Sequence, residues 1–559
     1  MTATSVGTSI ARAAGIIAVA TLLSRLAGFA RTLVFSQNVG TTSVGDVYQT
    51  INLVPNVVYE VAAGGVLAAV AVPLIAGQLG LGKEREADET ASALLSWAVV
   101  VLLPLSLVLA LVSPWLSRAL LGAGASDPEA TLGRHMLVLF APQVLLYGIG
   151  IVLSGVLQAR RRFLAAALAP LLSSLVVIAS YLTYGQLVDR SATTAATVSD
   201  GAVWVLAGGT TLGVVVLSLP LLVPTLRAGV RLRPTLRFPD GAARRAGSLA
   251  GAGVVALLAQ QGAVLATLWV THHRTDAVGA VNVYSYVQAV YLLPYAVLAV
   301  PIATSAFPAL AHTAAAESAD AELLPGTAAR DTLARSLRGI LLLVSGAAAV
   351  LMAVAQPVGE FFRSIDPGAH GATPGTRGSG TEALAALPGA LSAYAPGVVG
   401  FAVAALLTRA LYVRGRPLYA ALAVAAGWAV TALGPIALLP EGSSAASTLG
   451  VLGVSSTVGM TLSAAVLALL VRQAWGPEAL AGSGRTLGAA LVGVAVGFGV
   501  GDTAARSMQP QGVVSAVAVG VAVALLTSLS YLFVMAVGDR RSMQALRERG
   551  RRRRRGAAA

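Results

Sequence analysis

Residues 16–35 read IIAVATLLSRLAGFARTLVF, an apolar stretch that contains two arginines. A transmembrane helix needs about 20 predominantly apolar residues, and an arginine near its centre costs about 2.5–3.5 kcal/mol on insertion scales. Arg25 and Arg31 are therefore expected to face the protein interior or a water-filled path rather than lipid. Fixed positive charge along such a path favours an anionic cargo.

The composition of the chain is that of a polytopic membrane protein. Of its 559 residues, 56% are hydrophobic and 11% are charged, and its mean hydropathy is +0.79, values that an ordinary water-soluble protein of this size does not reach. The chain has no cysteine, which excludes a disulfide framework, a thiolate metal site and a cysteine nucleophile.

The charge pattern and the missing motifs exclude other classes of function. The net charge of +14 does not indicate nucleic-acid binding, because the basic residues lie between hydrophobic spans and not along one exposed face. No glycine-rich phosphate-binding loop is present, so ATP hydrolysis is not expected. The sequence predicts neither an enzyme nor a cofactor or metal site, and His272 and His273 are interpreted as interfacial residues.

We predict an all-α membrane protein with about fourteen transmembrane helices. The glycine-rich second, eighth and tenth spans fit the pattern least well. Most of the 38 lysine and arginine residues fall in alternate loops and in the C-terminal tail, which predicts that both termini are cytoplasmic.

Two segments six spans apart share a proline pattern, with Pro55 and Pro73 in the second span and Pro294 and Pro308 in the eighth. This displacement predicts two six-helix lobes in parallel orientation, although prolines also occur by chance in membrane helices. The predicted parts are an N-terminal lobe at 1–230, a C-terminal lobe at 231–480, two additional transmembrane helices at 481–538 and a basic cytoplasmic tail at 539–559.

The first span offers a site for phosphate. On an ideal helix Arg25, Gly28 and Arg31 define an arc of about 120°, with the arginines about 9 Å apart along the axis. Guanidinium is always charged and binds phosphate through two hydrogen bonds, which suits a lipid pyrophosphate. In the alternative interpretation each arginine pairs with an acid, such as Glu60 or Asp46, and only ties helices together.

The second span contributes two acids and several amides. Asp46, near its outer end, is interpreted either as a latch of the outer gate or as a helix N-cap. Glu60, near mid-span, either pairs with an arginine or binds a coupling cation. Asn52, Asn56 and Gln260 either hydrogen-bond a sugar headgroup or join neighbouring helices.

Several short motifs occur in the order found in one transporter family. The sequence SRLAGFAR at 24–31 resembles the first-helix motif of the MurJ (MviN) family, lipid II flippases of the multidrug/oligosaccharidyl-lipid/polysaccharide exporter superfamily. Asp46 before LVPN at 53–56, GVLQA at 155–159 and LYVR at 411–414 resemble further family motifs. With the residues considered above, the predicted substrate site consists of Ser24, Arg25, Gly28, Arg31, Asn52, Asn56, Glu60 and Gln260, with Asp46 as the predicted gating residue.

The chain departs from the family pattern at positions that matter for cargo. The family commonly has an acid where this chain has Thr32, and it has arginines where this chain has Tyr59 with Glu60 and, in the eighth span, Ala289. The cationic character of the site is therefore reduced to Arg25 and Arg31.

The resemblance implies a multi-pass protein of the bacterial cytoplasmic (inner) membrane that serves peptidoglycan and cell-wall synthesis. It would flip the undecaprenyl-pyrophosphate-linked precursor lipid II by alternating access, with the prenyl tail in a groove formed by the last two spans. Two alternatives remain: a flippase for another polyprenyl-linked glycan, and a non-transporting scaffold that contacts cell-wall synthesis proteins. The run Arg551–Arg555 is predicted to bind anionic membrane lipids.

Overall fold

The computed structural model describes residues 3–61, 68–122, 124–239, 242–307, 310, 327–370 and 380–539. These residues form helices joined by short connections, with no strand among them. The prediction of an all-α membrane protein is confirmed. Pro308 of the proline pattern and the arginine run of the tail lie outside the described residues.

The predicted count of fourteen spans is not confirmed. Twelve helices in the described part of the chain are long and apolar enough to cross a membrane, or up to 13 with the bent pair Thr381–Tyr394 and Gly397–Val413, whose axes differ by 45°. Of the predicted second span, the structure describes α2 (Ser43–Tyr59) and α3 (Ala68–Gly80). Its predicted centre, near residue 62, lies outside the described residues.

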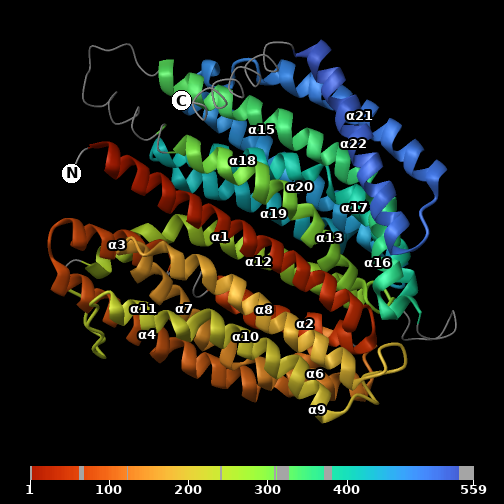
Figure 1. Cartoon of the computed structure of the whole chain (residues 1–559), viewed down its shortest axis with the longest axis horizontal. Coiled ribbons are helices and arrows are strands. Elements are labelled where there is room, and N and C mark those ends of the chain that lie inside the picture. The colour runs from red at the N-terminus through yellow and green to blue at the C-terminus, as the bar shows by residue number, and fades with distance from the viewer. Residues whose placement is uncertain are drawn as a thin grey trace. The chain divides into compact units, whose positions relative to one another are not determined.

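The chain divides into two compact units. Figure 1 labels the helices of which they consist. Unit 1 comprises residues 1–261, 271–282 and 366–381, and unit 2 comprises 262–270, 283–365 and 382–559. The predicted domain boundaries remain a prediction.

Unit 1 contains the N-terminal helices. They are α1 (Ala3–Asn38), α2, α3, α4 (Glu84–Leu111), α5 (Ser113–Leu121), α6 (Asp127–Phe140), α7 (Pro142–Ala159), α8 (Phe163–Leu187), α9 (Asp200–Val203), η2 (Trp204–Gly208), α10 (Gly209–Ser218), η3 (Leu219–Leu221), α11 (Leu222–Arg227), most of α12 (Ala242–His273) and η5 (Pro367–Ala369). Helix α1 packs along α8, α4 along α7, and α10 against α8. Leu153, Leu157, Ala169 and Leu221 form one of its apolar clusters.

A tight turn fixes where α2 starts. Thr42 is the N-cap of α2, and its hydroxyl accepts a hydrogen bond from the Gly45 backbone N–H at 3.1 Å. Gly40 has a φ of +66°, and a Cβ there would lie 2.4 Å from Asp366 Oδ1. Glycine is the residue that tolerates both the backbone conformation and the close approach. The turn thus fixes the first residue of α2 and, with it, the positions of the polar residues along this helix.

An extended connector follows α11 and runs along α4. The backbone N–H groups of Arg231, Arg233 and Thr235 donate to Asp88 Oδ2, Ser92 Oγ and Ser96 Oγ at 3.0, 3.1 and 3.1 Å. Alternate residues of an extended chain and every fourth residue of a helix both advance about 6 to 7 Å. The two spacings match, so the connector is held in register along the helix.

Unit 2 contains the C-terminal helices. They are most of α13 (Ala280–Pro294), η4 (Tyr295–Ala299), α15 (Thr327–Ala353), α16 (Ala355–Ile365), α17 (Thr381–Tyr394), α18 (Gly397–Val413), α19 (Pro417–Leu438), α20 (Ala445–Trp475), η6 (Pro477–Leu480), α21 (Ser483–Met508) and α22 (Gly512–Gly538). Helices α19 and α18 pack against α20, and α21 packs against both α15 and α22.

The pairing of α21 with α22 rests on small residues. Gly493, Gly497 and Gly501 are buried at intervals of four residues on α21. A Cβ on Gly501 would lie 2.1 Å from Thr527 Oγ1, and one on Gly493 would lie 2.9 Å from the Tyr531 ring. Small residues at this spacing let membrane helices approach closely.

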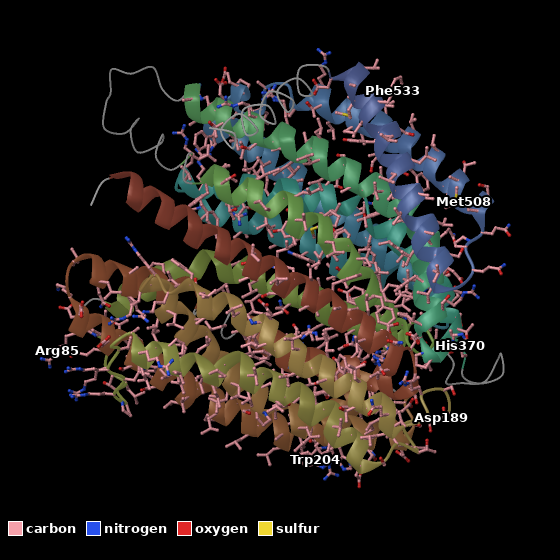
Figure 2. The ribbon with its side chains drawn as sticks, viewed as in Figure 1. Arg85, Asp189, Trp204, His370, Met508 and Phe533 are labelled. Carbon is pink, nitrogen blue, oxygen red and sulfur yellow. The ribbon has the colours of Figure 1, made fainter. Side chains whose placement is uncertain are left out.

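Large apolar side chains remain exposed on both units, as expected of surfaces that face lipid. Trp204 of unit 1 and Phe533 of unit 2 are 65% and 71% exposed and project from their helices in Figure 2. Residues of this type on a water-soluble protein would form an aggregation-prone surface.

Candidate functional site

Two arginines of α1, Arg25 and Arg31, are the central feature of the candidate site. Both Arg25 and Arg31 are exposed. Neither forms an ion pair with Glu60 or Asp46, and neither has another acidic partner among the described residues. The donors of these two guanidinium groups thus remain available to a ligand.

The residues beside the arginines have different roles. A Cβ on Gly28 would meet no atom within 4 Å, so the surface between the arginines is open. The Ser24 hydroxyl lies 2.8 Å from the Ala20 carbonyl oxygen and 2.9 Å from that of Ala167 on α8. In this structure Ser24 therefore joins α1 to α8, while its predicted contact with substrate remains a prediction.

The polar residues of α2 form a short chain of contacts with α7. Asn56 Nδ2 donates to the Asn52 carbonyl oxygen at 2.9 Å, and the Tyr147 hydroxyl donates to Asn56 Oδ1 at 3.1 Å. The rings of Tyr147 and Tyr59 lie 4.4 Å apart with an interplanar angle of 41°. All four side chains are half-buried. The contacts combine amide groups and an aromatic surface on one part of unit 1.

A buried network of hydroxyl groups lies elsewhere on α2. The Tyr48 hydroxyl lies 2.8 Å from that of Tyr181 and 2.7 Å from Thr210 Oγ1. Tyr48, Tyr181 and Thr210 are buried, and their contacts tie α2, α8 and α10 together.

Sequence analysis did not identify Tyr59, Tyr147 and Tyr181 as members of the site. Their presence within apolar spans could have pointed to them, because a buried tyrosine hydroxyl needs a hydrogen-bond partner. Which partners they have depends on how α2, α7 and α8 pack, and local sequence does not encode that packing.

Two predicted site residues stand apart from these contacts. Glu60 lies just beyond the last residue of α2, and Gln260 lies on α12; both are half-buried. Neither side chain has a hydrogen-bond or ion-pair partner in the described part of the chain. Their roles toward cargo remain predictions.

The N-cap interpretation of Asp46 is wrong, because Thr42 occupies that position and Asp46 lies at the fourth residue of α2. Asp46 Oδ1 accepts a hydrogen bond from the Gly279 N–H at 3.1 Å, and its Oδ2 lies 3.9 Å from His272 Nδ1. The His272 side chain is 8% exposed and its Nε2 lies 2.7 Å from Thr50 Oγ1. The His272 side chain is thus largely covered by protein, and its position at the membrane interface remains a prediction.

Asp46 and His272 line a cavity of about 380 Å³ within unit 1. Its other polar lining residues include Ser126, Glu129, Thr275 and Asp276. No group of three or more histidine, cysteine or acidic side chains arranged for a metal ion occurs in the ranges that the structure describes. The predicted gating role of Asp46 remains a prediction, now with named partners.

Comparison with known proteins agrees with this architecture. The sequence model of the family described as "Lipid II flippase MurJ" matches residues 35–523. The chain belongs to the MurJ family. It is therefore a multi-pass protein of the bacterial inner membrane, as this family and the apolar helices indicate.

Two relatives show the level of similarity. A "Probable lipid II flippase MurJ" of Rhizobium meliloti (strain 1021) is 27% identical over 350 residues, which is 61% of this chain and 60% of that protein. One from Synechocystis sp. is 29% identical over 236 residues, which is 41% of this chain and 43% of that protein. The match to the Rhizobium tropici member of the MurJ family spans only 31% of that protein.

Solved structures share the fold. A structure titled "Lipid II flippase MurJ, inward closed conformation" superposes with a TM-score of 0.68 at 16% identity, covering 93% of this chain and 98% of that one. An inward-facing MATE transporter of the MOP superfamily gives a TM-score of 0.59 at 15% identity, covering 82% and 97%. The MurJ chain aligns over a larger share of this protein than the MATE chain does.

Proposed function

We propose that this protein translocates lipid II, an undecaprenyl-pyrophosphate-linked peptidoglycan precursor, across the cytoplasmic membrane by alternating access. The observation that supports this most directly is the pair Arg25 and Arg31, exposed and without acidic partners on an otherwise apolar helix. Two free guanidinium groups about 9 Å apart along the axis can bind the two phosphates of a pyrophosphate.

The membrane-spanning helices and family membership support a transporter, and MurJ flippases move their cargo without converting it. In this proposal the arginines hold the pyrophosphate in a wet path while the prenyl tail stays in lipid, along α21 and α22. Both termini are cytoplasmic, as the distribution of basic residues predicts. The basic tail then lies at the inner leaflet, next to anionic lipids.

The test is rescue of surface-exposed lipid II in cells depleted of this protein, measured with an externally added lipid II-cleaving enzyme. Wild type should restore exposure, and Arg25→Ala/Arg31→Ala should not. An Arg118→Ala variant serves as control, because Arg118 is an exposed arginine of α5 that pairs with Asp127 at 3.8 Å. Equal amounts of each variant in the membrane fraction must be shown. Full rescue by the double variant would reject the arginine site.

A second cargo is favoured by the pair Tyr59 and Tyr147. Where related family members carry an arginine, this chain presents the Tyr59 ring, whose centroid lies 4.4 Å from that of the tilted Tyr147 ring. Aromatic faces and amides suit sugars, so the cargo could differ in its glycan while keeping the polyprenyl pyrophosphate. Competition between lipid II and other polyprenyl glycans for the purified protein distinguishes the two cargos.

A further inference from the structure

A second cavity, of about 630 Å³, lies within unit 2 at the connection between α21 and α22. It is bounded by α16, by the first half of α17 and by the connecting residues Gln509–Gln511. This is the end of the α21–α22 pair remote from the tail, and none of the residues discussed for cargo belongs to it.

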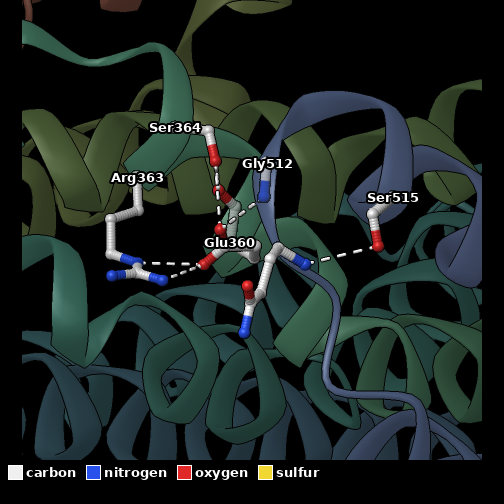
Figure 3. A network of polar contacts seen from close by, with 6 residues as sticks. Glu360, Arg363, Ser364, Gly512 and Ser515 are labelled. Carbon is white, nitrogen blue, oxygen red and sulfur yellow. Dashed lines mark hydrogen bonds and ion pairs between the residues drawn. The ribbon is translucent and has the colours of Figure 1, made fainter.

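The connection is fixed to α16 through one carboxylate. Glu360 Oε1 accepts a hydrogen bond from the Gly512 N–H at 3.0 Å, and its other oxygen pairs with Arg363, whose Nε lies 2.9 Å away (Figure 3). Ser364 Oγ lies 3.1 Å from Glu360 Oε1. Burial raises the pKa of Glu360, but the hydrogen bonds from Gly512, Arg363 and Ser364 outweigh it and hold the pKa below its usual value. The carboxylate is thus saturated by the protein itself.

The donors that line the cavity are not saturated. Arg363 uses its Nε and Nη2 on Glu360, and Arg506 uses its Nε on Asp502 Oδ2 at 2.7 Å. The remaining guanidinium N–H groups have no partner among the described residues, and neither do the side-chain amides of Gln356, Gln509 and Gln511. The cavity wall therefore combines two cations and three amides with a single carboxylate that is already occupied.

Gln509 adds an unusual backbone feature at the rim. It ends α21 with a φ of +40°, in the left-handed region that helix ends usually fill with glycine. A glutamine at this position keeps an amide beside the cavity despite the less favourable backbone conformation. Strained residues of this kind cluster at ligand sites.

The surroundings of the cavity indicate an amphipathic ligand. Its floor includes the apolar residues Leu384, Pro388 and Ala505. Directly beside it, α21 and α22 expose Met508 and Val514, which are 51% and 83% exposed. A chain of carbon atoms can lie against this apolar surface while its polar head enters the donor-rich cavity.

We infer that this cavity binds the phosphate group of an anionic membrane lipid, held by Arg363, Arg506 and the three glutamine amides. Guanidinium and amide N–H groups are the donors that recognise phosphate oxygens. The phosphate can come from a bulk phospholipid or from a polyprenyl phosphate carrier. The inference does not depend on which cargo the α1 arginines bind.

Native mass spectrometry of the full-length protein in detergent tests this inference, with phosphatidylglycerol, undecaprenyl phosphate and zwitterionic phosphatidylcholine as separate probes. Wild type should retain at least one of the two anionic lipids tenfold more tightly than phosphatidylcholine. Preference for undecaprenyl phosphate identifies the carrier as the source, and equal retention identifies the anionic phosphate in general. Equal retention of all three lipids would overturn the inference.

Two variants locate the site. Arg363→Gln/Arg506→Gln should lower retention of the anionic lipid at least tenfold, while Arg118→Gln, another exposed and ion-paired arginine, should change it less than twofold. Arg363→Gln also removes a partner of Glu360, so Gln509→Gly provides an independent test. Glycine relieves the positive φ at this position, so the melting temperature of the variant should stay the same or rise. Its retention of the anionic lipid should fall about threefold, because the amide is lost. Unchanged retention in both cavity variants would overturn the inference.

Discussion

At the scale of single residues, Arg25 and Arg31 of α1 contrast with charged side chains that pair within the protein. Asp88 and Arg160, for example, are 15% and 14% exposed and lie 2.6 Å apart, so their charges are neutralised within the protein. Arg25 and Arg31 have no such partner. Unpaired charge in a membrane protein is costly, and this cost is consistent with a role in binding an anion.

Tyr59 should contribute to cargo affinity through its ring. We expect Tyr59→Ala to weaken binding of purified lipid II about tenfold, or ~1.4 kcal/mol, because the pair with Tyr147 is lost. Tyr59→Phe should retain most of the affinity.

Tyr419→Ala is the matched control for this measurement, because Tyr419 is a 58% exposed tyrosine of α19 in unit 2. An equal loss of binding in the two alanine variants, or no loss in either, would contradict an aromatic contact with cargo.

At the scale of elements, the positions of the long helices could be predicted from hydropathy. The bends within spans and the choice of neighbouring helices could not. Hydropathy located the long spans, since burial in lipid demands a continuous apolar stretch. It did not locate the 45° bend between α17 and α18. Such breaks depend on neighbouring helices that satisfy the freed backbone groups, and this information is spread over distant parts of the chain.

The glycine stripe of α21 provides a stability prediction. Gly501→Val should destabilise the protein by about 1–3 kcal/mol, because the new side chain collides with Thr527. Gly499→Val makes the same chemical change two residues away, where a Cβ meets no atom within 4 Å. Melting temperatures of the two purified variants should therefore separate clearly, and equal values would show that α21 and α22 do not pack through Gly501.

The connector along α4 gives a second prediction at this scale. Asp88→Ala removes the acceptor of the Arg231 N–H and the partner of Arg160, so the connector should detach and trypsin should cleave faster after Arg231. Asp127→Ala, at a carboxylate that is 95% exposed, should leave cleavage unchanged. Mass spectrometry of the tryptic peptides measures the cleavage in each variant. Identical cleavage of the Asp88→Ala and Asp127→Ala variants would argue against the hydrogen bonds described between the connector and α4.

At the scale of the whole molecule, the distribution of basic residues predicts the orientation in the membrane. The chain has no cysteine, so single cysteines introduced at chosen sites report topology without background. Ala192→Cys should react with a membrane-impermeant maleimide in intact cells, and Lys83→Cys only after permeabilisation. Both side chains are exposed. The reverse pattern would place the termini outside.

The membrane class and most helices could be predicted from composition, because they depend on sums over many residues. The candidate site was predicted in part: Arg25 and Arg31 are charged residues that an apolar helix does not explain. The contacts of Asp46 with Gly279 and His272, and the pairing of Tyr59 with Tyr147, join residues far apart in sequence. A single sequence gives no measure of such distant proximity.

The loop after α16 has a consequence for the chain as a gene product. Although α16 and α17 belong to unit 2, residues 366–381 belong to unit 1, where buried Asp366 accepts hydrogen bonds from the Thr41 N–H and hydroxyl at 2.8 and 2.9 Å. Residues 271–282 likewise return to unit 1. A polypeptide that ended at residue 240 would lack both pieces, whereas the fragment from residue 241 onward would contain all of unit 2. In a split gene, the N-terminal product would therefore depend on the C-terminal product for the completion of its unit.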